Sequence, residues 1–423
     1  MSWMWILPIM FGLMLLNMRI YLAMFTAIVV YFLFFNSLPF GVAVQRLVAP
    51  AQNSTLLAIP FFILLGTLLS HTGVAERILH LANLLVGKFR GGMAMANITM
   101  STLMGGVSAS NLADAAMLSK MMVPEMERQG YSRAFAAAVT ASGSLVTPII
   151  PPGIALIIYG MVADVSIGRM FMAGILPGLL CALLLMVAVW LVSVKRGYKP
   201  MLKEWPKPRE LGQATFNAWP ALLVLVGVVG GIRANIFTPT EAGAAGVVIV
   251  AFIGFVIYKK MTLGHVGHAL TTTAKSTASI MLVIMASSAL AWIFSLEHAG
   301  VAMASWISSL TDNKYVFLAA VNILLLLLGM FIEGTALIIV LVPLLKPVMM
   351  QMGIDPIHFG LIMILNLSIG TLTPPVGTVM LLVCNITRVT MNEFLKESVA
   401  LLLALLVALA LVTYVPAISL LLT

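Results

Sequence analysis

Hydroxyl and amide side chains interrupt an apolar stretch of this sequence at residues 105–114 (GGVSASNLAD). Ser108, Ser110 and Asn111 offer oxygen ligands there, and the two glycines before them let the backbone turn tightly. A helix that begins at this turn would direct the positive end of its dipole at an anion. These residue types predict a binding site for small ions or carboxylates, in a helical hairpin around residues 104–125.

A second polar segment, called the first break below, follows at residues 142–152 (SGSLVTPIIPP). Its prolines remove backbone donors and break a helix, so we expect carbonyl groups at positions 143–148 without intrahelical partners. Such carbonyls, together with hydroxyls, suit a hard cation such as sodium, by analogy with other hard ions. Ser142 and Thr147 of this segment, with Ser110 and Asp114 of the hairpin, are the candidate substrate contacts.

Both segments recur later in the chain at an offset of 223 residues. The coinciding pairs are Gly106/Gly329, Leu118/Leu341, Pro124/Pro347, Gly130/Gly353, Pro151/Pro374 and Pro152/Pro375. The second copy places Glu333, Gly334 and Thr335 in a hairpin around residues 327–348, and its break is the segment 368–375 (SIGTLTPP). Paired interrupted segments in two halves of a membrane protein are typical of transporter binding sites. An odd number of spans between the copies, which the apolar blocks favour, would make the repeats inverted.

A packing role is the alternative for these polar residues, because Ser and Thr are common between membrane helices. Their duplication beside two Pro-Pro breaks favours binding for the set. Asp114 and Glu333 differ between the copies, and an ionisable group inside a bilayer is costly and usually functional. Either could instead orient the loop at a hairpin tip, so the sequence leaves their roles open.

The composition requires a membrane. Of 423 residues, 61% are hydrophobic and only 9% are charged, whereas a soluble domain carries roughly 25% charged residues. Only helices or closed barrels satisfy every backbone group in lipid, and long runs without alternation exclude a barrel. We therefore expect an all-α polytopic inner-membrane protein, in contact with lipid.

The net charge of +9 does not indicate nucleic-acid binding, because its densest stretch lies in one polar loop. This loop, residues 195–215, contains Lys195, Arg196 and Lys199, and the positive-inside rule predicts a cytoplasmic position for it. The two cysteines lie in apolar stretches and predict neither a disulfide nor a metal site.

An enzyme is poorly supported. No His or Lys base and no second nearby carboxylate completes a catalytic set with Ser108 or Asp114. The chain also has no phosphate loop and no motif for a cofactor, so we expect none beyond a coupling ion. A channel is a further alternative, but paired hairpins suit alternating access better.

The sequence resembles the large membrane subunit of tripartite ATP-independent periplasmic (TRAP) transporters over nearly its whole length. The motifs that carry the resemblance are residues 59–66 (IPFFILLG), 105–124, 125–131 (EMERQGY), 149–152 (IIPP), 237–243 (FTPTEAG), 353–360 (GIDPIHFG) and 372–377 (LTPPVG). The first hairpin carries Asn111 and Asp114, where many dicarboxylate-type members have only Ser, Thr and Ala, and so it looks closer to the sialic-acid branch. Glu241 matches a family landmark for which the residues themselves indicate no role.

The resemblance implies an elevator-type transporter that imports an organic acid, of the sialic acid or C4-dicarboxylate type, with sodium. It also implies two partners, which are a small four-helix membrane subunit and a periplasmic substrate-binding protein. Carried over residue by residue, the first sodium site would comprise Ser108, Asn111, Gly143, Val146 and Pro148. The second would comprise Gly334, Thr335, Gly370 and Thr373.

These expectations divide the chain into scaffold and transport segments. Residues 1–90 and 166–310 would be scaffold, 91–165 and 311–390 the two hairpin repeats of the transport domain, and 391–423 a C-terminal helix. The main alternative is a transporter of the wider superfamily that takes its organic anion without a binding protein.

Overall fold

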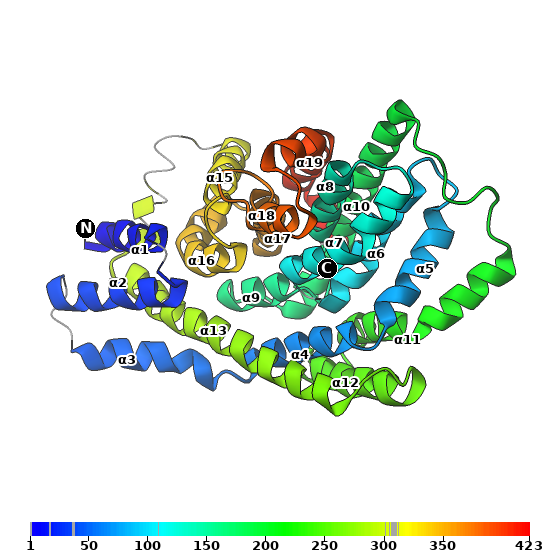
Figure 1. Cartoon of the computed structure of the whole chain (residues 1–423). Coiled ribbons are helices and arrows are strands. Elements are labelled where there is room, and N and C mark those ends of the chain that lie inside the picture. The colour runs from blue at the N-terminus through cyan, green and yellow to red at the C-terminus, as the bar shows by residue number, and fades with distance from the viewer. Residues whose placement is uncertain are drawn as a thin grey trace.

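The computed structural model describes residues 2–16, 18–35, 39–108, 110–300, 302–303, 305, 311 and 313–423. In this part of the chain the fold is α-helical, as predicted (Figure 1). Five helices are long and apolar enough to cross a membrane, or up to seven if each of two bent helix pairs forms one span. The described residues therefore form a multi-span membrane protein.

The helices before the basic loop are α1 (Ile6–Leu15), α2 (Ile20–Phe34), α3 (Phe40–Val48), α4 (Ala58–Ser70), α5 (Val74–Val86), α6 (Gly92–Ser108), α7 (Asn111–Arg128), α8 (Arg133–Ser144), α9 (Ile154–Val162) and α10 (Ile167–Arg196). Those after it are α11 (Pro208–Arg233), α12 (Pro239–Phe252), α13 (Leu263–Leu296), α15 (Lys314–Gly329), α16 (Gly334–Gln351), α17 (Pro356–Gly370), α18 (Thr378–Thr387), α19 (Met391–Tyr414) and α20 (Pro416–Leu420). Many begin at a Ser, Thr or Asp cap or at a proline in the first turn, where a missing N–H is harmless.

The structure confirms the internal repeat. Helices α7 and α16 have the same length, and their bounds differ by the same offset of 223 residues that aligns the sequences. Both begin with a side-chain cap at equivalent positions, because Ser110 accepts the Ala113 N–H and Glu333 accepts the Ala336 N–H. In each copy a helix pair (α6–α7, α15–α16) is followed by a helix that ends in a Pro-Pro break, and then by a short helix (α9, α18).

The two copies are inverted. The Tyr159 hydroxyl, near the end of the first copy, donates to the Pro356 carbonyl 2.6 Å away, where α17 of the second copy begins. At the other end, Arg133 at the start of α8 and Arg388 just after α18 line one recess. The last helix of each copy therefore ends beside the turn that opens the third helix of the other, as a two-fold axis in the membrane plane requires.

The helices of the two copies gather in the middle of the molecule, while α13 runs along one side of them beside α2 and α4 (Figure 1). This arrangement resembles the expected split between transport helices and scaffold. The predicted boundaries at 90, 165, 310 and 390 stay predictions, because no relative motion of the parts is observed.

The basic loop is shorter than the predicted range of 195–215. Helix α10 continues through Lys195 and Arg196, and α11 begins at Pro208, so the connection comprises residues 197–207. Pro208 lies in the first turn of α11, where its fixed φ angle favours the helix. The Lys88 ammonium donates to the Lys203 carbonyl at 2.6 Å, which ties this loop to the end of α5.

The second hairpin packs so closely against its break that position 370 has no room for a Cβ atom and requires glycine. A Cβ atom on Gly370 would lie 2.7 Å from the Gly329 carbonyl carbon, which belongs to backbone and cannot rotate away. Overpacking of this kind costs about 1–3 kcal/mol. We expect Gly370→Ala to lower thermal stability and uptake.

Gly227→Ala is the matched control, because nothing lies within 4 Å of a Cβ atom at Gly227. It should leave both properties at the wild-type level. Thermal unfolding in detergent and uptake into proteoliposomes measure the two effects, and equal behaviour of the two variants would contradict the close approach.

Candidate functional site

The tips of both hairpins and parts of both breaks line one cavity of about 320 Å³. The polar residues that these segments contribute are Ser110, Asn111, Glu333, Thr335, Ser368, Thr371 and Thr378. Helices α7 and α16 both begin here, so their N-terminal ends face the same space. No Lys, Arg or His of the described residues lines the cavity, so an anion in it would rely on helix N-termini, hydroxyls and bound cations.

The first hairpin brings part of the predicted set to the cavity. Ser110 and Asn111 line it, and so does Pro148 of the first break. The Asn111 carboxamide oxygen accepts the Leu112 N–H at 2.9 Å, which holds the side chain at the helix start. The side chain of Ser108 lies outside the described residues, although its backbone ends α6.

The second hairpin brings Gly334 and Thr335 to the same cavity, together with Glu333. The Glu333 carboxylate accepts the Ala336 N–H at 3.2 Å and a short hydrogen bond from the Thr335 hydroxyl. Negative charge at the N-terminal end of a helix is stabilised by the helix dipole. Glu333 therefore orients its hairpin tip, as one interpretation of the sequence expected, and it also lines the cavity. The functional role considered from the sequence stays a prediction.

The breaks differ in detail from the prediction of unpartnered carbonyls. The Gly143 carbonyl accepts the Val146 N–H at 3.1 Å, and the Val146 carbonyl accepts the N–H groups of Ile149 and Ile150. The expectation was wrong for these two carbonyls, because the chain tightens into i→i+3 turns where the prolines end the regular helix. The Gly143 carbonyl oxygen has one N–H bond and keeps a second lone pair for a cation, whereas the Val146 carbonyl oxygen already accepts two N–H groups.

The second break forms the same turn. The Gly370 carbonyl accepts the Thr373 N–H at 3.0 Å, and the Thr373 hydroxyl donates to the Ile369 carbonyl at 2.9 Å. The Gly377 N–H bonds the Met330 carbonyl at 3.2 Å and so joins the break to the hairpin tip. Gly370 and Thr373 do not line the cavity themselves; they lie in the turn next to Thr371, which does.

Three of the four predicted substrate contacts lie elsewhere. Asp114, Ser142 and Thr147 are fully buried, and none of them lines the cavity. The Thr147 hydroxyl donates to one carboxylate oxygen of Asp114 at 3.2 Å. Of the predicted substrate set, only Ser110 reaches the cavity in this conformation.

Sequence reasoning missed the opposite wall of the cavity. Thr67 of α4 and Thr272 and Ser276 of α13 face the hairpin tips across it. The signal was present as the polar run 271–276 (TTTAKS), which precedes an apolar stretch of the same helix. That run was overlooked because it lies outside the repeated segments.

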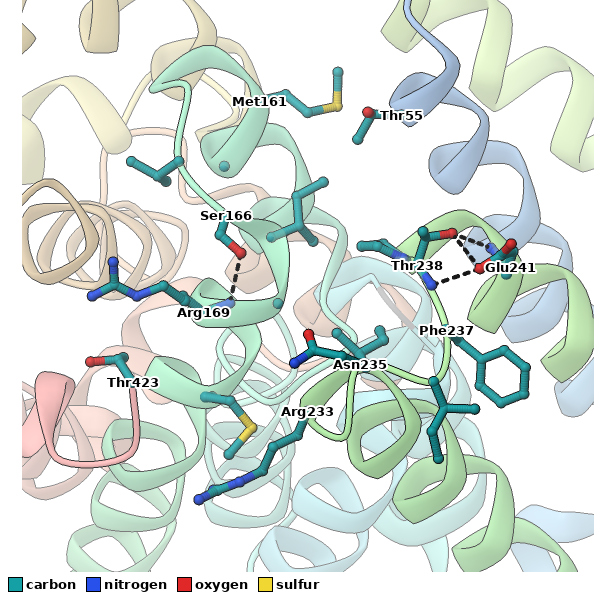
Figure 2. A pocket seen from close by; sticks show the side chains of 18 of the residues that line it. Thr55, Met161, Ser166, Arg169, Arg233, Asn235, Phe237, Thr238, Glu241 and Thr423 are labelled. Carbon is teal, nitrogen blue, oxygen red and sulfur yellow. Dashed lines mark hydrogen bonds between the residues drawn. The ribbon is translucent and has the colours of Figure 1, made fainter.

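A larger cavity, of about 930 Å³, lies at the end of the molecule opposite the basic loop (Figure 2). It is lined by the start of α10, the end of α11, the start of α12 and the C-terminal residue, and it includes Arg169 and Arg233. The Glu241 carboxylate accepts the Thr238 N–H at 2.8 Å and its hydroxyl at 2.9 Å, so its role is to cap α12. None of the predicted site residues lies here.

Three histidines cluster where α4 ends and α13 begins. The His71 ring stacks on His265 with centroids 4.7 Å apart and meets His268 edge-on at 6.0 Å. Burial and the two neighbouring rings lower the pKa of His71. Among the described residues, no group of three or more His, Cys, Asp or Glu side chains is arranged to hold a metal ion.

The comparison with known protein families identifies the family of this chain. The family model described as the DctM component of tripartite ATP-independent periplasmic transporters matches residues 7–418. The chain belongs to the DctM family. It is therefore a large permease subunit of a bacterial TRAP transporter for organic acids and a multi-pass membrane protein, not an enzyme.

Individual DctM relatives agree with this assignment. The large permease protein SiaM of a sialic acid TRAP transporter from Vibrio cholerae is 38% identical over 97% of this chain and 96% of its own length. The large permease protein DctM of a C4-dicarboxylate TRAP transporter from Pseudomonas aeruginosa is 36% identical over 89% of this chain and 87% of its own. The YdaH transporter of Alcanivorax borkumensis shares the fold, with a TM-score of 0.61 at 16% identity over 90% and 89% of the two chains.

Filling the cavity should stop transport without unfolding the protein. Ser276 lines the cavity from α13, so Ser276→Phe would place a ring in the space between the hairpin tips. Ala278→Phe on the exposed side of the same helix adds the same ring outside the cavity. We expect uptake to be lost only in the first variant, measured in proteoliposomes at matched protein content. Uptake by both variants would show that the substrate does not pass through this cavity.

Proposed function

We propose that this permease imports an organic acid by sodium symport, with an elevator movement of the two hairpin repeats past α4 and α13. The observation that supports this most is one cavity lined by both inverted hairpins, both breaks and the α4–α13 wall. A site shared between a repeated unit and a separate wall can change its exposure by sliding one against the other. A binding-protein-independent transporter of the same superfamily remains the alternative to be excluded by experiment.

Two sodium sites are proposed. The first comprises Ser108, Asn111, Gly143, Val146 and Pro148, and the second comprises Gly334, Thr335, Gly370 and Thr373. Asn111 and Pro148 meet at the cavity from different segments, as do Thr335 and the turn that carries Gly370. Neutral amide, hydroxyl and carbonyl oxygens are the ligands expected for a hard monovalent cation.

The substrate is proposed to be a hydroxylated carboxylic acid such as sialic acid, with C4-dicarboxylates as the second class. Bound sodium and the two helix N-termini would neutralise its carboxylate. Ser110, Thr67, Thr272 and Ser276 supply hydroxyls around the same space, which suits a ligand that itself carries hydroxyl groups. Relatives named for both substrate classes match the chain, so the family alone does not choose between them.

A small four-helix subunit and a periplasmic binding protein are the proposed partners. If the basic loop is cytoplasmic, the large cavity with Arg169 and Arg233 opens to the periplasm. Neither arginine is in a salt bridge within the described residues, so both are available to an acidic surface. We propose that the binding protein docks over this cavity when it delivers substrate.

Removing the side-chain amide of Asn111, in the proposed first sodium site, should weaken the activation of uptake by sodium. Asn111→Ala deletes a proposed ligand, and a lost ligand of this kind costs about 1 kcal/mol, or roughly fivefold in the sodium concentration for half-maximal uptake. Asn217→Ala removes an exposed amide that does not line the cavity and serves as the control. An unchanged sodium dependence in Asn111→Ala would remove this residue from the site.

Reversing charge at the periplasmic cavity should weaken dependence on the binding protein. Arg169→Glu combined with Arg233→Glu should raise the binding-protein concentration needed for half-maximal uptake, because opposite charges steer association. Arg209→Glu, near the start of α11, reverses a charge at the other end and should have no such effect. Wild-type uptake without any binding protein would instead select the alternative function.

A further inference from the structure

Asp114 is a buried carboxylate that the two proposed sodium sites do not use. It lies in the first turns of α7, has no solvent exposure, and does not line the cavity. Two hydroxyl groups lie beside it, that of Thr147 in the first break and that of Ser101 in α6. In the described residues it makes no salt bridge.

Two buried polar atoms at Asp114 are left without partners among the described residues. One carboxylate oxygen accepts the Thr147 hydroxyl at 3.2 Å, while the other, Oδ1, has no hydrogen bond. The Ser101 hydroxyl beside this carboxylate is fully buried and also lacks a hydrogen-bond partner. Buried polar groups are normally satisfied, so these two unpaired oxygens require a cause.

A positive charge would account for these atoms. An ionised carboxylate removed from water is strongly destabilising unless it is paired, and one neutral hydroxyl is not a sufficient partner. A carboxylate oxygen with nearby hydroxyl oxygens is a ligand set that hard cations prefer. The three segments also meet closely, because a Cβ atom on Gly143 would lie only 3.3 Å from the Ser101 hydroxyl oxygen.

The second repeat has no equivalent. The residue 223 positions after Asp114 is Leu337, which is buried and apolar. The residue equivalent to Thr147 is Gly370, which has no side chain to offer. Asp114 is therefore not explained by the backbone geometry that the two copies share, and its function belongs to the first repeat alone.

We propose that Asp114 is the carboxylate of an additional monovalent cation site, formed with Ser101 and Thr147 between α6, α7 and the first break. The inference rests on the proposed sodium coupling and adds one ion to it. A cation in this position joins both helices of the first hairpin to the break behind them. It also adds one positive charge to the translocated unit, beyond those of the two proposed sodium sites.

The test is equilibrium binding of ²²Na⁺ to the purified full-length permease with its small subunit. Asp114→Asn keeps the shape of the side chain and removes its charge, so it should bind one sodium fewer than the wild type. If Asp114→Asn binds as many sodium ions as the wild type, the inference is overturned. The same holds if the substitution removes only the pH dependence of uptake, because the positive charge at Asp114 would then be a proton. Wild-type protein that binds no sodium would refute the proposed coupling itself, which is a separate outcome.

A second pair of variants keeps the test decisive if Asp114→Asn fails to fold. Ser101→Ala removes a hydroxyl of the proposed site, and Ser119→Ala removes another buried hydroxyl of α7 that also lacks a hydrogen bond. The first should weaken the affinity of one sodium by on the order of tenfold, and the second should not. Equal sodium affinity in both variants would overturn the site.

Discussion

Backbone polar groups at the centre of a membrane must find partners within the protein, and this constraint governs the arrangement of the two repeats. A Pro-Pro break leaves N–H and carbonyl groups that lipid cannot satisfy. Here each break tightens into i→i+3 turns, and the Gly377 N–H of the second reaches the Met330 carbonyl at the hairpin tip. Hairpin and break are therefore one unit, and the contact of Gly370 with Gly329 shows how closely they pack.

The proposed binding site follows from that pairing. Two inverted units place two helix N-termini and parts of two irregular segments around one cavity. The caps show how the copies diverged within a conserved geometry, because Ser110 and Glu333 bond equivalent N–H groups with different chemistry. One tip presents a hydroxyl and the other a carboxylate, so the cavity is symmetric in backbone and asymmetric in charge.

Much of this architecture could be predicted from the sequence, because glycine and proline positions record backbone geometry directly. The offset between Pro124 and Pro347 predicted a repeat whose helices α7 and α16 the structure confirms. Side-chain direction was harder to predict, since a helical residue can face a cavity or a neighbouring helix. Asp114 and Thr147 belong to polar segments but face each other away from the cavity, whereas Ser276 reaches it from a helix outside the repeat.

The central claim is that substrate binds between the inverted hairpin tips. It is tested most directly by a cryo-electron microscopy map of the permease, reconstituted with its small subunit in sodium and an excess of the transported acid. The account predicts substrate density in contact with Ser110 on one side and Thr335 on the other, against the wall formed by Thr272 and Ser276. An empty cavity between the tips, with substrate density in the larger cavity beside Arg169 and Arg233, would contradict it.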